Sequence, residues 1–505
     1  MKYRITATPD EITDRRSRTA SLPSADSLLL GFGRRHWGVV AALAFTLLIH
    51  APTLRYFFAG DDFILLGNME WRGSSWGFVI DSFRLEDYVP SWRPLSAVIY
   101  VAEWRLFGLN AAPWRALALI IHLASMTLLY ALLTRTLHKP GVAASAALIF
   151  GVSGAHYQTV TYVTAFPHVL ETFFVLASLL TLVSYAQDGE HSLAAFAFSF
   201  VLFALAFLAN ESAFVYAVVL VAAYALFSQR WAPLRPLRLV FHAAPFVAIA
   251  AGWLVFYQSS DNFQIKFADG TWGTHVFSGY ALYLSWLLYP AHTIPLDPDA
   301  LRWVLGGVVA LAVLLFAVRG PDIARLAAIG VFVALLPFVP VVWTTSRYAY
   351  GAVAFFAPLA AISAAWIYER LSTLHRHARI PANMLALALV AAIAALYAWQ
   401  SNAHNAQSGR DTDRWRLLVD ELRANEPSVA SGTTIWIVDG PWTEPLSQYT
   451  EVPNVARALY GDASAFDLPR AQYQQQPPHD ARQLFLEWDG AHLRPTSEEE
   501  LLAGR

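Results

Sequence analysis

Two adjacent aspartates, Asp61 and Asp62, follow the first long apolar stretch of the chain, residues 37–58. A carboxylate pair at a membrane boundary is energetically costly, and ionisable residues there are functional candidates. Two carboxylates this close repel each other, so one of them is expected to hold a proton near neutral pH. Such a pair suits general-base catalysis on a hydroxyl. The alternative is a helix-ending turn in which water solvates both side chains, and the pair alone does not decide between the two.

Two arginines further along the chain are candidates for binding a phosphate. Arg93 lies in Ser-Trp-Arg-Pro-Leu at 91–95, and Arg347 lies in Thr-Thr-Ser-Arg-Tyr at 344–348. A guanidinium can donate two parallel hydrogen bonds to a carboxylate or a phosphate. The hydroxyls before Arg347 and the phenol of Tyr348 would add to an anion site at the depth of lipid headgroups. The alternative for both arginines is an ordinary interfacial anchor.

A polar dipeptide, Asn210-Glu211, interrupts an apolar stretch that otherwise runs from about 193 to 227. One helix of that length with a charge in its middle is unfavourable, so the chain is expected to turn here. Glu211 would then face the same aqueous cavity as the aspartates. The alternative is that the two residues only cap the next helix, because an acidic residue stabilises the positive helix end.

Two histidines, His156 and His168, fall near one predicted turn and are candidates for lining the same cavity. A lone intramembrane histidine more often serves as a hydrogen-bonded packing residue than as a ligand. No spacing typical of metal ligands occurs in the sequence, so no metal site and no cofactor are predicted. A divalent metal stays an open alternative.

The composition predicts a polytopic membrane protein. Of 505 residues, 56% are hydrophobic and only 14% are charged, and the mean hydropathy is +0.41. A soluble domain of this size does not carry so much apolar surface. The formal net charge of −2 gives no indication of a nucleic-acid partner. The chain has no cysteine, which excludes disulfides and thiolate metal sites.

About 20 apolar residues are needed to cross a bilayer as a helix. Eleven candidate spans follow from this length: 37–58, 114–137, 141–157, 167–187, 192–209, 212–228, 238–257, 301–318, 323–343, 348–368 and 382–400. The segment 277–292 is interpreted as a re-entrant or interfacial helix. With the amino terminus inside, the loops 138–140, 228–238, 319–325 and 369–380 are also inside, and they carry the lysines and arginines that the positive-inside rule requires.

The same topology divides the chain into three parts. Residues 1–36 are expected to form a disordered cytoplasmic tail, because they are mostly polar and lack the apolar core of a signal peptide. Residues 37–400 form the membrane domain, with a long outer loop at 59–113 that is rich in aromatic and charged residues, as interfacial helices are. Residues 401–505 form a small extracytoplasmic α/β domain.

Taken together, these motifs resemble the membrane glycosyltransferases of the GT-C superfamily. The closest similarity is to protein O-mannosyltransferases, to transmembrane TPR-type O-mannosyltransferases and to their bacterial relatives. The resemblance covers roughly residues 37–370. It is carried by Asp61-Asp62, Trp92-Arg93-Pro94-Leu95, Phe107-Gly108-Leu109, His122, Asn210-Glu211, Leu288-Tyr289-Pro290 and Arg347-Tyr348.

The sequence departs from the family pattern at several positions. Arg115 and Ala118 stand where relatives often place histidine and asparagine, and Asn210 stands where they often have lysine. His156-Tyr157 replaces a His-Pro pair, and no TPR repeats follow the last span. These departures concern the acceptor and the way in which the donor phosphate is bound.

The resemblance implies an all-α polytopic fold and an inverting transfer of a mannose-like sugar from a polyprenyl-phosphate donor to an acceptor hydroxyl. One of Asp61 and Asp62 would be the catalytic base. Arg347, with Tyr348 and Arg93, would bind the donor phosphate, and Glu211, Asn210, His156 and His168 would line the cavity on the acceptor side. The acceptor would be a protein, a glycan or a lipid. The location implied is a cell membrane, in bacteria the inner membrane, with the site on the periplasmic face.

A transporter or lipid flippase is the rival hypothesis, since such proteins carry charged residues at mid-depth and often contain inverted repeats. No repeat is found in this sequence, and its charged residues are expected at one face. A third alternative is a non-catalytic scaffold, which predicts that Asp61 and Asp62 point into open water with no cavity behind them.

Overall fold

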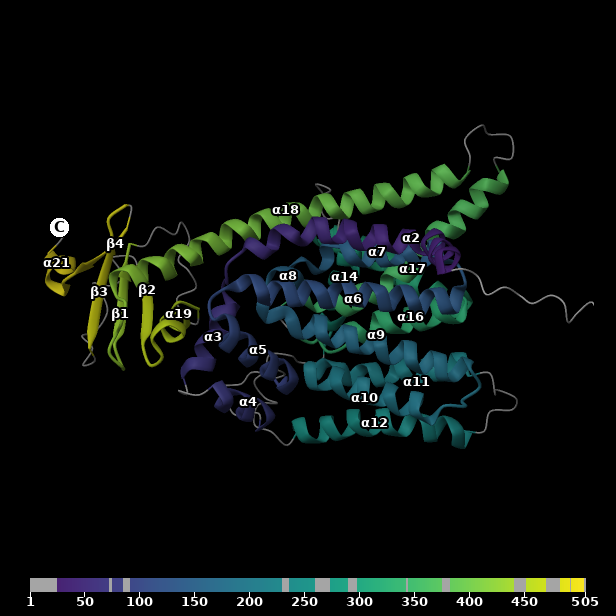
Figure 1. Cartoon of the computed structure of the whole chain (residues 1–505), viewed down its shortest axis with the longest axis horizontal. Coiled ribbons are helices and arrows are strands. Elements are labelled where there is room, and N and C mark those ends of the chain that lie inside the picture. Colours follow the sequence, from purple (N-terminus) through teal and green to yellow (C-terminus); the bar gives the residue numbers. More distant parts are fainter. Residues whose placement is uncertain are drawn as a thin grey trace, which may run out of the picture.

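The chain folds into a long helical bundle with a small sheet at one end (Figure 1). The computed structural model describes residues 25–71, 75–84, 91–228, 236–258, 273–288, 298–341, 344–374, 382–439, 451–468, 482–490 and 492–503. The predicted fold class, a polytopic helical membrane protein with a small α/β part at its carboxyl end, is confirmed.

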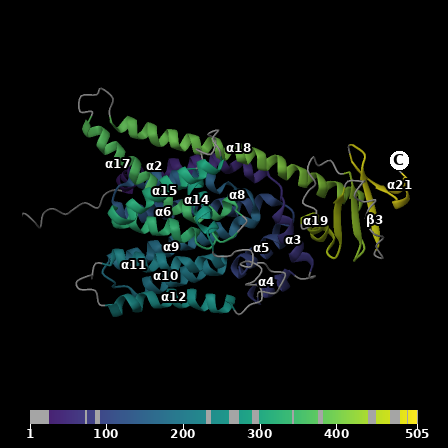
Figure 2. The same cartoon turned by 180° about the vertical axis from the view of Figure 1, so that it is seen from behind.

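The bundle is formed by α2 (Ala25–His50), α6 (Ala111–Leu137), α7 (Pro140–Val152), α9 (Phe166–Gln187), α10 (Leu193–Ala209), α11 (Tyr216–Phe227), α12 (Pro236–Gln258), α14 (His275–Leu287), α15 (Pro298–Arg319), α16 (Asp322–Leu335), α17 (Tyr350–Leu374) and the first part of α18 (Ala382–Asn425). In both views α10, α11 and α12 form a layer beside the rest of the bundle (Figures 1 and 2). The amino-terminal helix α2 begins within the segment predicted to be a tail.

Each of the eleven predicted spans overlaps a helix. Six helices in the described part of the chain are long and apolar enough to cross a membrane: His36–Arg55, Ala111–Leu137, Val163–Gln187, Pro236–Phe256, Ala300–Arg319 and Ser346–Arg370. Three shorter apolar helices are Pro140–Val152, Leu193–Ala209 and Glu211–Phe227. The chain is therefore a multi-pass membrane protein. Helix α14 has 13 residues, as many as α7, so its length does not separate an interfacial helix from a span, and the end of the segment 277–292 lies outside the described residues.

Local signals in the sequence explain where several helices break. The Asn110 side chain accepts a hydrogen bond from Ala112 N and caps α6, which ends at His138 in the left-handed conformation. The Ser192 side chain caps α10 in the same way, by accepting from Ala195 N. At Asn210 the backbone is extended, with φ of −155°, and a 3-10 turn, η4 (Glu211–Val215), follows. The turn predicted at Asn210-Glu211 is thus present.

The predicted outer loop 59–113 is largely helical. It contains α3 (Asp61–Trp71), α4 (Ser75–Arg84) and α5 (Pro94–Phe107). These helices lie at the end of the bundle that faces the sheet (Figure 1). The Trp104 indole of α5 donates a hydrogen bond to the Glu70 carboxylate of α3, which ties two of the helices together.

The sheet has four strands, β1 (Thr434–Val438), β2 (Ser464–Leu468), β3 (Gln483–Trp488) and β4 (Leu493–Thr496), in the order β2-β1-β3-β4. Strand β1 pairs in parallel with β2 and β3, and β4 is antiparallel to β3. Two helices, α19 (Glu451–Tyr460) and α21 (Glu498–Ala503), complete this part of the chain. The strand predicted at 433–438 is therefore present. Helix α18 runs without a break from the bundle to the sheet (Figure 1).

Helix α3 is packed between the bundle and the carboxyl-terminal part. The Phe63 ring lies 5.2 Å from the Trp415 ring of α18, between centroids. Gly67 faces Asn454 of α19 so closely that a Cβ atom at residue 67 would lie 2.7 Å from Asn454 Oδ1. The guanidinium of Arg416 also donates to the Arg55 carbonyl, 2.8 Å away. Helix α3, which begins with the two aspartates, is thus packed against α18 and α19.

At the opposite end of the bundle, ion pairs join the helix connections. Lys139 Nζ lies 2.9 Å from Glu369 Oε1, and Arg135 Nη2 lies 2.6 Å from Asp188 Oδ1. The connections around 138–140 and 369 therefore lie at the same end, as the charge pattern predicted. This end is remote from α3, α4 and α5 (Figure 2).

We predict that Gly67→Ala lowers the melting temperature, because the added methyl group must push α3 away from Asn454. Overpacking of this kind costs roughly 1–3 kcal/mol. The matched control is Gly307→Ala in α15, where nothing lies within 4 Å of an added Cβ and alanine only improves the helix. Thermal unfolding in detergent measures both. Equal melting temperatures for the two variants would contradict the packing described for α3.

Candidate active site

A cavity of about 380 Å³ opens at the end of the bundle that carries α3, α4 and α5. Its lining brings together residues that are far apart in the sequence. Five of the predicted site residues line it: Asp61, Arg93, His168, Arg347 and Tyr348. Others that line it were not predicted, among them Asn68, Ser82, Tyr100 and Thr164.

Each charged residue of the cavity wall stands at or beside the beginning of a helix. Asp61 opens α3, and Arg93 is the residue before Pro94, the first residue of α5. Arg347 lies in the 3-10 turn η6 (Ser346–Ala349) that leads into α17, and Glu211, which pairs with Arg93 but does not itself line the cavity, opens η4. Because these connections all lie at one end of the bundle, charges separated by long apolar helices meet there.

Asp61 and Arg347 form a direct ion pair across 286 residues of sequence. Arg347 Nη1 donates to Asp61 Oδ2 at 2.8 Å. The side chains are partly exposed, Asp61 by 41% and Arg347 by 22%. The guanidinium carbon of Arg347 also lies 5.8 Å from the centroid of the Tyr348 ring. The cavity therefore contains a carboxylate and a guanidinium in contact, both within reach of a solute.

The second ion pair of the cavity joins Arg93 to Glu211. Arg93 Nε donates to Glu211 Oε2 at 2.9 Å, and Arg93 Nη2 lies 3.5 Å from Glu211 Oε1. The side chains are exposed by 24% and 13%. Glu211 thus serves as the counter-charge of Arg93, which explains why the chain carries a carboxylate at this point.

Asp62 has a different environment from its neighbour. Its side chain is buried and accepts hydrogen bonds from Ala59 N at 3.2 Å, Thr164 N at 2.9 Å and Thr164 Oγ1 at 3.2 Å. Burial raises the pKa of Asp62, while the nearby Arg115 and the three hydrogen bonds oppose the rise. With three donors fixed on it, Asp62 ties the start of α3 to the turn η3 (Val163–Ala165).

Arg115 of α6 stabilises the chain that leads into α3. Its side chain is buried, and it donates to the carbonyls of Tyr56 and Phe57 at 3.3 and 2.6 Å. These carbonyls lie in the segment between η1 (Ala51–Arg55) and α3. Arg115 therefore both holds the chain that leads to the aspartates and places a positive charge near Asp62.

A buried polar cluster lies behind the cavity. Asn210 Nδ2 lies 2.9 Å from His168 Nδ1 and donates to Glu171 Oε2 at 3.0 Å, and Ser212 Oγ donates to Glu171 Oε1 at 2.8 Å. Glu171 was missed in the sequence. Glu171 lies inside the predicted span 167–187, and an acidic residue within a span is itself a signal of function. Asn210 acts here through His168 and Glu171 and does not line the cavity.

Aromatic rings fix the position of Tyr348. Its ring stacks on Phe338 with centroids 4.3 Å apart and planes 7° apart, and His168 meets it edge-on at 5.6 Å. Tyr348 is therefore a rigid wall of the cavity. The turn η2 ends at His156, but the His156 side chain lies outside the described residues.

Among the described residues, no group of three or more histidine, aspartate or glutamate side chains is placed to hold a metal ion. Close to the cavity the charges instead occur as pairs of opposite sign. Arginine and carboxylate pairs of this kind suit the recognition of an anion together with a hydroxyl.

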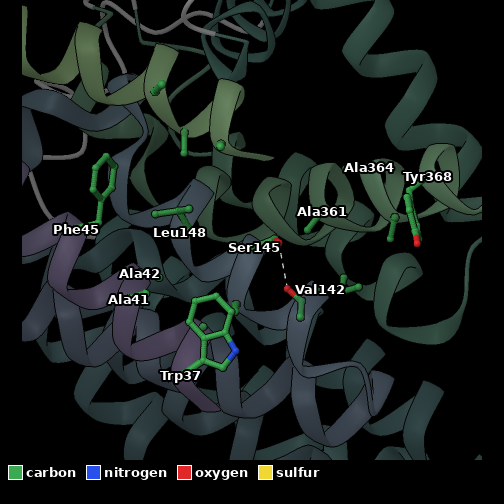
Figure 3. Close-up of a pocket in the computed structure, with 17 residues that line it drawn as sticks. Trp37, Ala41, Ala42, Phe45, Val142, Ser145, Leu148, Ala361, Ala364 and Tyr368 are labelled. Carbon is green, nitrogen blue, oxygen red and sulfur yellow. Dashed lines mark hydrogen bonds between the residues drawn. The ribbon is translucent and has the colours of Figure 1, made fainter. Parts of the chain in front are cut away.

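A larger cavity, of about 760 Å³, lies between α2, α7, α17 and α18 (Figure 3). It is lined by apolar and small side chains such as Trp37, Phe45, Leu148 and Ala361. The one serine in its wall, Ser145, donates its hydroxyl to the Gly141 carbonyl at 3.0 Å. Since the described residues that line it include no carboxylate, histidine, lysine or arginine, this cavity is not the candidate active site in spite of its size.

Comparison with solved structures shows which folds this one resembles. The structure of ArnT from Cupriavidus metallidurans, bound to undecaprenyl phosphate, is similar over 89% of this chain and 93% of that chain, with a TM-score of 0.50 and 14% identity. The Archaeoglobus fulgidus oligosaccharyltransferase, tethered with an acceptor peptide, gives a TM-score of 0.50 and 14% identity over 87% of this chain. This chain spans 64% of that enzyme's length. The fold is that of the GT-C glycosyltransferases.

The sequence comparison indicates the family more closely. Residues 92–256 match the family of dolichyl-phosphate-mannose-protein mannosyltransferases. No curated protein sequence matches the chain. The resemblance predicted from the motifs is therefore confirmed by a family match over residues 92–256 and by a fold similar to that of two solved glycosyltransferases. The matched segment contains Arg93, His168, Asn210 and Glu211, whereas Asp61 and Arg347 lie on either side of it.

We predict that Asp62→Ala lowers the melting temperature far more than Asp61→Ala does. Removing the Asp62 carboxylate leaves the buried Ala59 N–H and the partly buried Thr164 N–H without their acceptor, at up to about 1–3 kcal/mol for each group. Removing Asp61 breaks a half-exposed ion pair, which is worth about 0–1 kcal/mol. Thermal unfolding of the two variants in the same detergent is the measurement. Similar losses at the two adjacent positions would contradict the distinct roles derived from their contacts.

Burial also affects Glu103 of α5, whose side chain is 6% exposed. Burial raises the pKa of Glu103 from 4.5 to about 8. The folded state thus favours the protonated carboxyl. The stabilisation is complete below pH 4.5 and is lost as the pH rises towards about 8.

We therefore predict that Glu103→Gln removes this pH dependence. Between pH 5 and 8 the wild-type protein should lose up to about 1.4 kcal/mol of stability per pH unit relative to the variant. Chemical or thermal unfolding across this pH range measures the difference. The control is Glu369→Gln, at a carboxylate that is 59% exposed and should leave the slope unchanged. Parallel profiles for Glu103→Gln and the wild type would exclude a protonated Glu103.

Proposed function

We propose that this protein is a glycosyltransferase that moves a mannose-like sugar from a polyprenyl-phosphate donor to an acceptor hydroxyl, with inversion at the anomeric carbon. The observation that carries the proposal is the contact of Asp61 with Arg347 in one cavity at the end of a membrane bundle. The family match supports the donor class, and a solved relative was bound to undecaprenyl phosphate. The acceptor would be a protein, a glycan or a lipid.

Asp61 is the catalytic base in this proposal. It is the aspartate that lines the cavity and is partly exposed, so an acceptor hydroxyl can reach it. The acceptor oxygen attacks the anomeric carbon, and its proton passes to the Asp61 carboxylate. The bond between the anomeric carbon and the phosphate oxygen breaks, and the polyprenyl phosphate leaves with the electron pair. Asp62, with its three hydrogen bonds, holds the start of α3 in place for this step.

Arg347 binds the donor phosphate and stabilises the charge that develops on it as it leaves. Fixed cations in a partly desolvated site are effective in this role because they need no reorganisation during the reaction. Tyr348 supplies the rigid wall beside Arg347, and Arg93, held by Glu211, adds a second positive charge to the cavity. His168, fixed through Asn210 and Glu171, forms another part of the cavity wall.

The location of the site supports a lipid-linked donor. The cavity lies where the long apolar helices end and the shorter helices α3, α4 and α5 begin, a depth at which a lipid phosphate can remain with its hydrocarbon tail in the bilayer. We propose that this end faces away from the cytoplasm, as the charge pattern predicts, and in bacteria faces the periplasm from the inner membrane. Residues 401–505 would then lie outside the membrane, with the 37–400 segment as the catalytic domain.

A transporter would be favoured by ion pairs at mid-depth along a path through the bundle. Four ion pairs that join different elements of the bundle lie instead at its two ends, with Asp61–Arg347 and Arg93–Glu211 at one end and Lys139–Glu369 and Arg135–Asp188 at the other. This distribution favours a lipid-dependent enzyme over a carrier.

We expect that Asp61→Asn lowers the transfer rate by about 10²- to 10⁴-fold, because a general base contributes on this scale. The assay uses the purified protein with a polyprenyl-phosphate-linked sugar and an acceptor, and follows release of polyprenyl phosphate. Asp188→Asn, which removes a carboxylate at the opposite end of the bundle, is the control and should keep full activity. A fully active Asp61→Asn variant would rule out Asp61 as the base.

Arg347→Gln is expected to raise KM for the donor by about tenfold or more while changing KM for the acceptor little. A hydrogen bond to a charged group is worth about 1.5–3 kcal/mol, and this one would be made to the donor phosphate. Initial rates at varied donor and acceptor concentrations separate the two constants. An equal rise in both would argue against a phosphate site at Arg347.

A further inference from the structure

We propose that the donor phosphate takes the place of Asp61 on Arg347, so that donor binding releases Asp61 from its ion pair to act as the base for the acceptor. The inference rests on the proposed function and adds to it an order of events. Its basis is that the base and the phosphate-binding cation of the cavity are joined to each other in this structure.

The Asp61–Arg347 pair has the geometry of an exchangeable contact. One hydrogen bond of 2.8 Å joins the side chains, and the Asp61 carboxylate is 41% exposed. A single, half-exposed ion pair of this kind contributes only about 0–1 kcal/mol. Both partners line the cavity, so an incoming anion reaches Arg347 without crossing protein.

The neighbouring carboxylates are held more firmly and are not expected to exchange. Glu211 makes two contacts with Arg93 and is 13% exposed. Asp62 is buried and accepts three hydrogen bonds from Ala59 and Thr164. Of the acidic residues described around the cavity, Asp61 is thus the one that a phosphate can displace at small cost.

The phosphate competes well for Arg347 because of its shape and charge. A phosphodiester has two non-bridging oxygens that a guanidinium can grip together, whereas Asp61 is bound through one oxygen. Once Arg347 turns to the phosphate, Asp61 loses its hydrogen-bond donor and can accept one from the acceptor hydroxyl. The same movement therefore fixes the leaving group and frees the base.

Binding of undecaprenyl phosphate, used here as the probe, tests the exchange. We expect Asp61→Asn to bind it about two- to fivefold more tightly than the wild type, because a competitor for Arg347 has been removed. The same substitution should remove transfer activity, so binding and catalysis change in opposite directions. Titration of the probe into detergent-solubilised protein, with thermal unfolding as the check of folding, measures the effect.

A double-mutant cycle separates the exchange from simple charge repulsion. In an Arg347→Gln background, Asp61→Asn should leave the affinity for undecaprenyl phosphate unchanged, because there is no longer a guanidinium for which the two anions compete. Tightening of equal size in both backgrounds would mean that Asp61 only repels the phosphate through space, and it would overturn the proposal. Asp188→Asn, remote from the cavity, is the control and should bind as the wild type does.

The remaining outcomes are also decisive. If Asp61→Asn binds undecaprenyl phosphate as the wild type does, or more weakly, the exchange is wrong while the proposed function stands. If the folded wild-type protein does not bind undecaprenyl phosphate at all, both the exchange and the proposed polyprenyl-phosphate donor are wrong.

Discussion

An apolar bundle can hold ionised side chains only where other protein groups compensate their charge, and this constraint shapes the site. Asp62 is buried, and its position depends on N–H groups of Ala59 and Thr164 and on the charge of Arg115. Because Thr164 belongs to η3 and Arg115 to α6, their interactions with one carboxylate draw the start of α3 against η3 and α6. The partly exposed Asp61 then has a fixed place beside Arg347. A carboxylate that water can reach is thus positioned by one that water cannot reach.

Much of the membrane fold could be predicted from the sequence, because apolar length and helix-breaking residues are local signals. The break at Asn210 and the strand at 434–438 are examples. The packing of α3 on α19 could not be predicted in this way, since the contact of Gly67 with Asn454 joins segments with no shared periodicity. The helical nature of the outer loop was also only partly visible, through its aromatic and charged composition.

Several residues of the candidate site could be predicted from the sequence, but the ion pairs that they form could not. Asp61 and Arg347 were singled out by residue type and by position near the ends of apolar stretches, yet nothing local in the sequence indicates that they touch across 286 residues. Glu171 was overlooked because a single acid in a strongly apolar span hardly alters its hydropathy. Arg115 was noted as a departure from relatives, and its contacts with the carbonyls of Tyr56 and Phe57 appear only in three dimensions.

Helix α18 has 44 residues, which corresponds to a length of about 66 Å. The hydrocarbon layer of a bilayer is only about 30 Å thick. One helix therefore connects the apolar bundle to the four-stranded sheet and is about twice as long as a hydrocarbon layer is thick. With the proposed topology, the sheet offers a surface that a large hydrophilic molecule can contact while it stays in water.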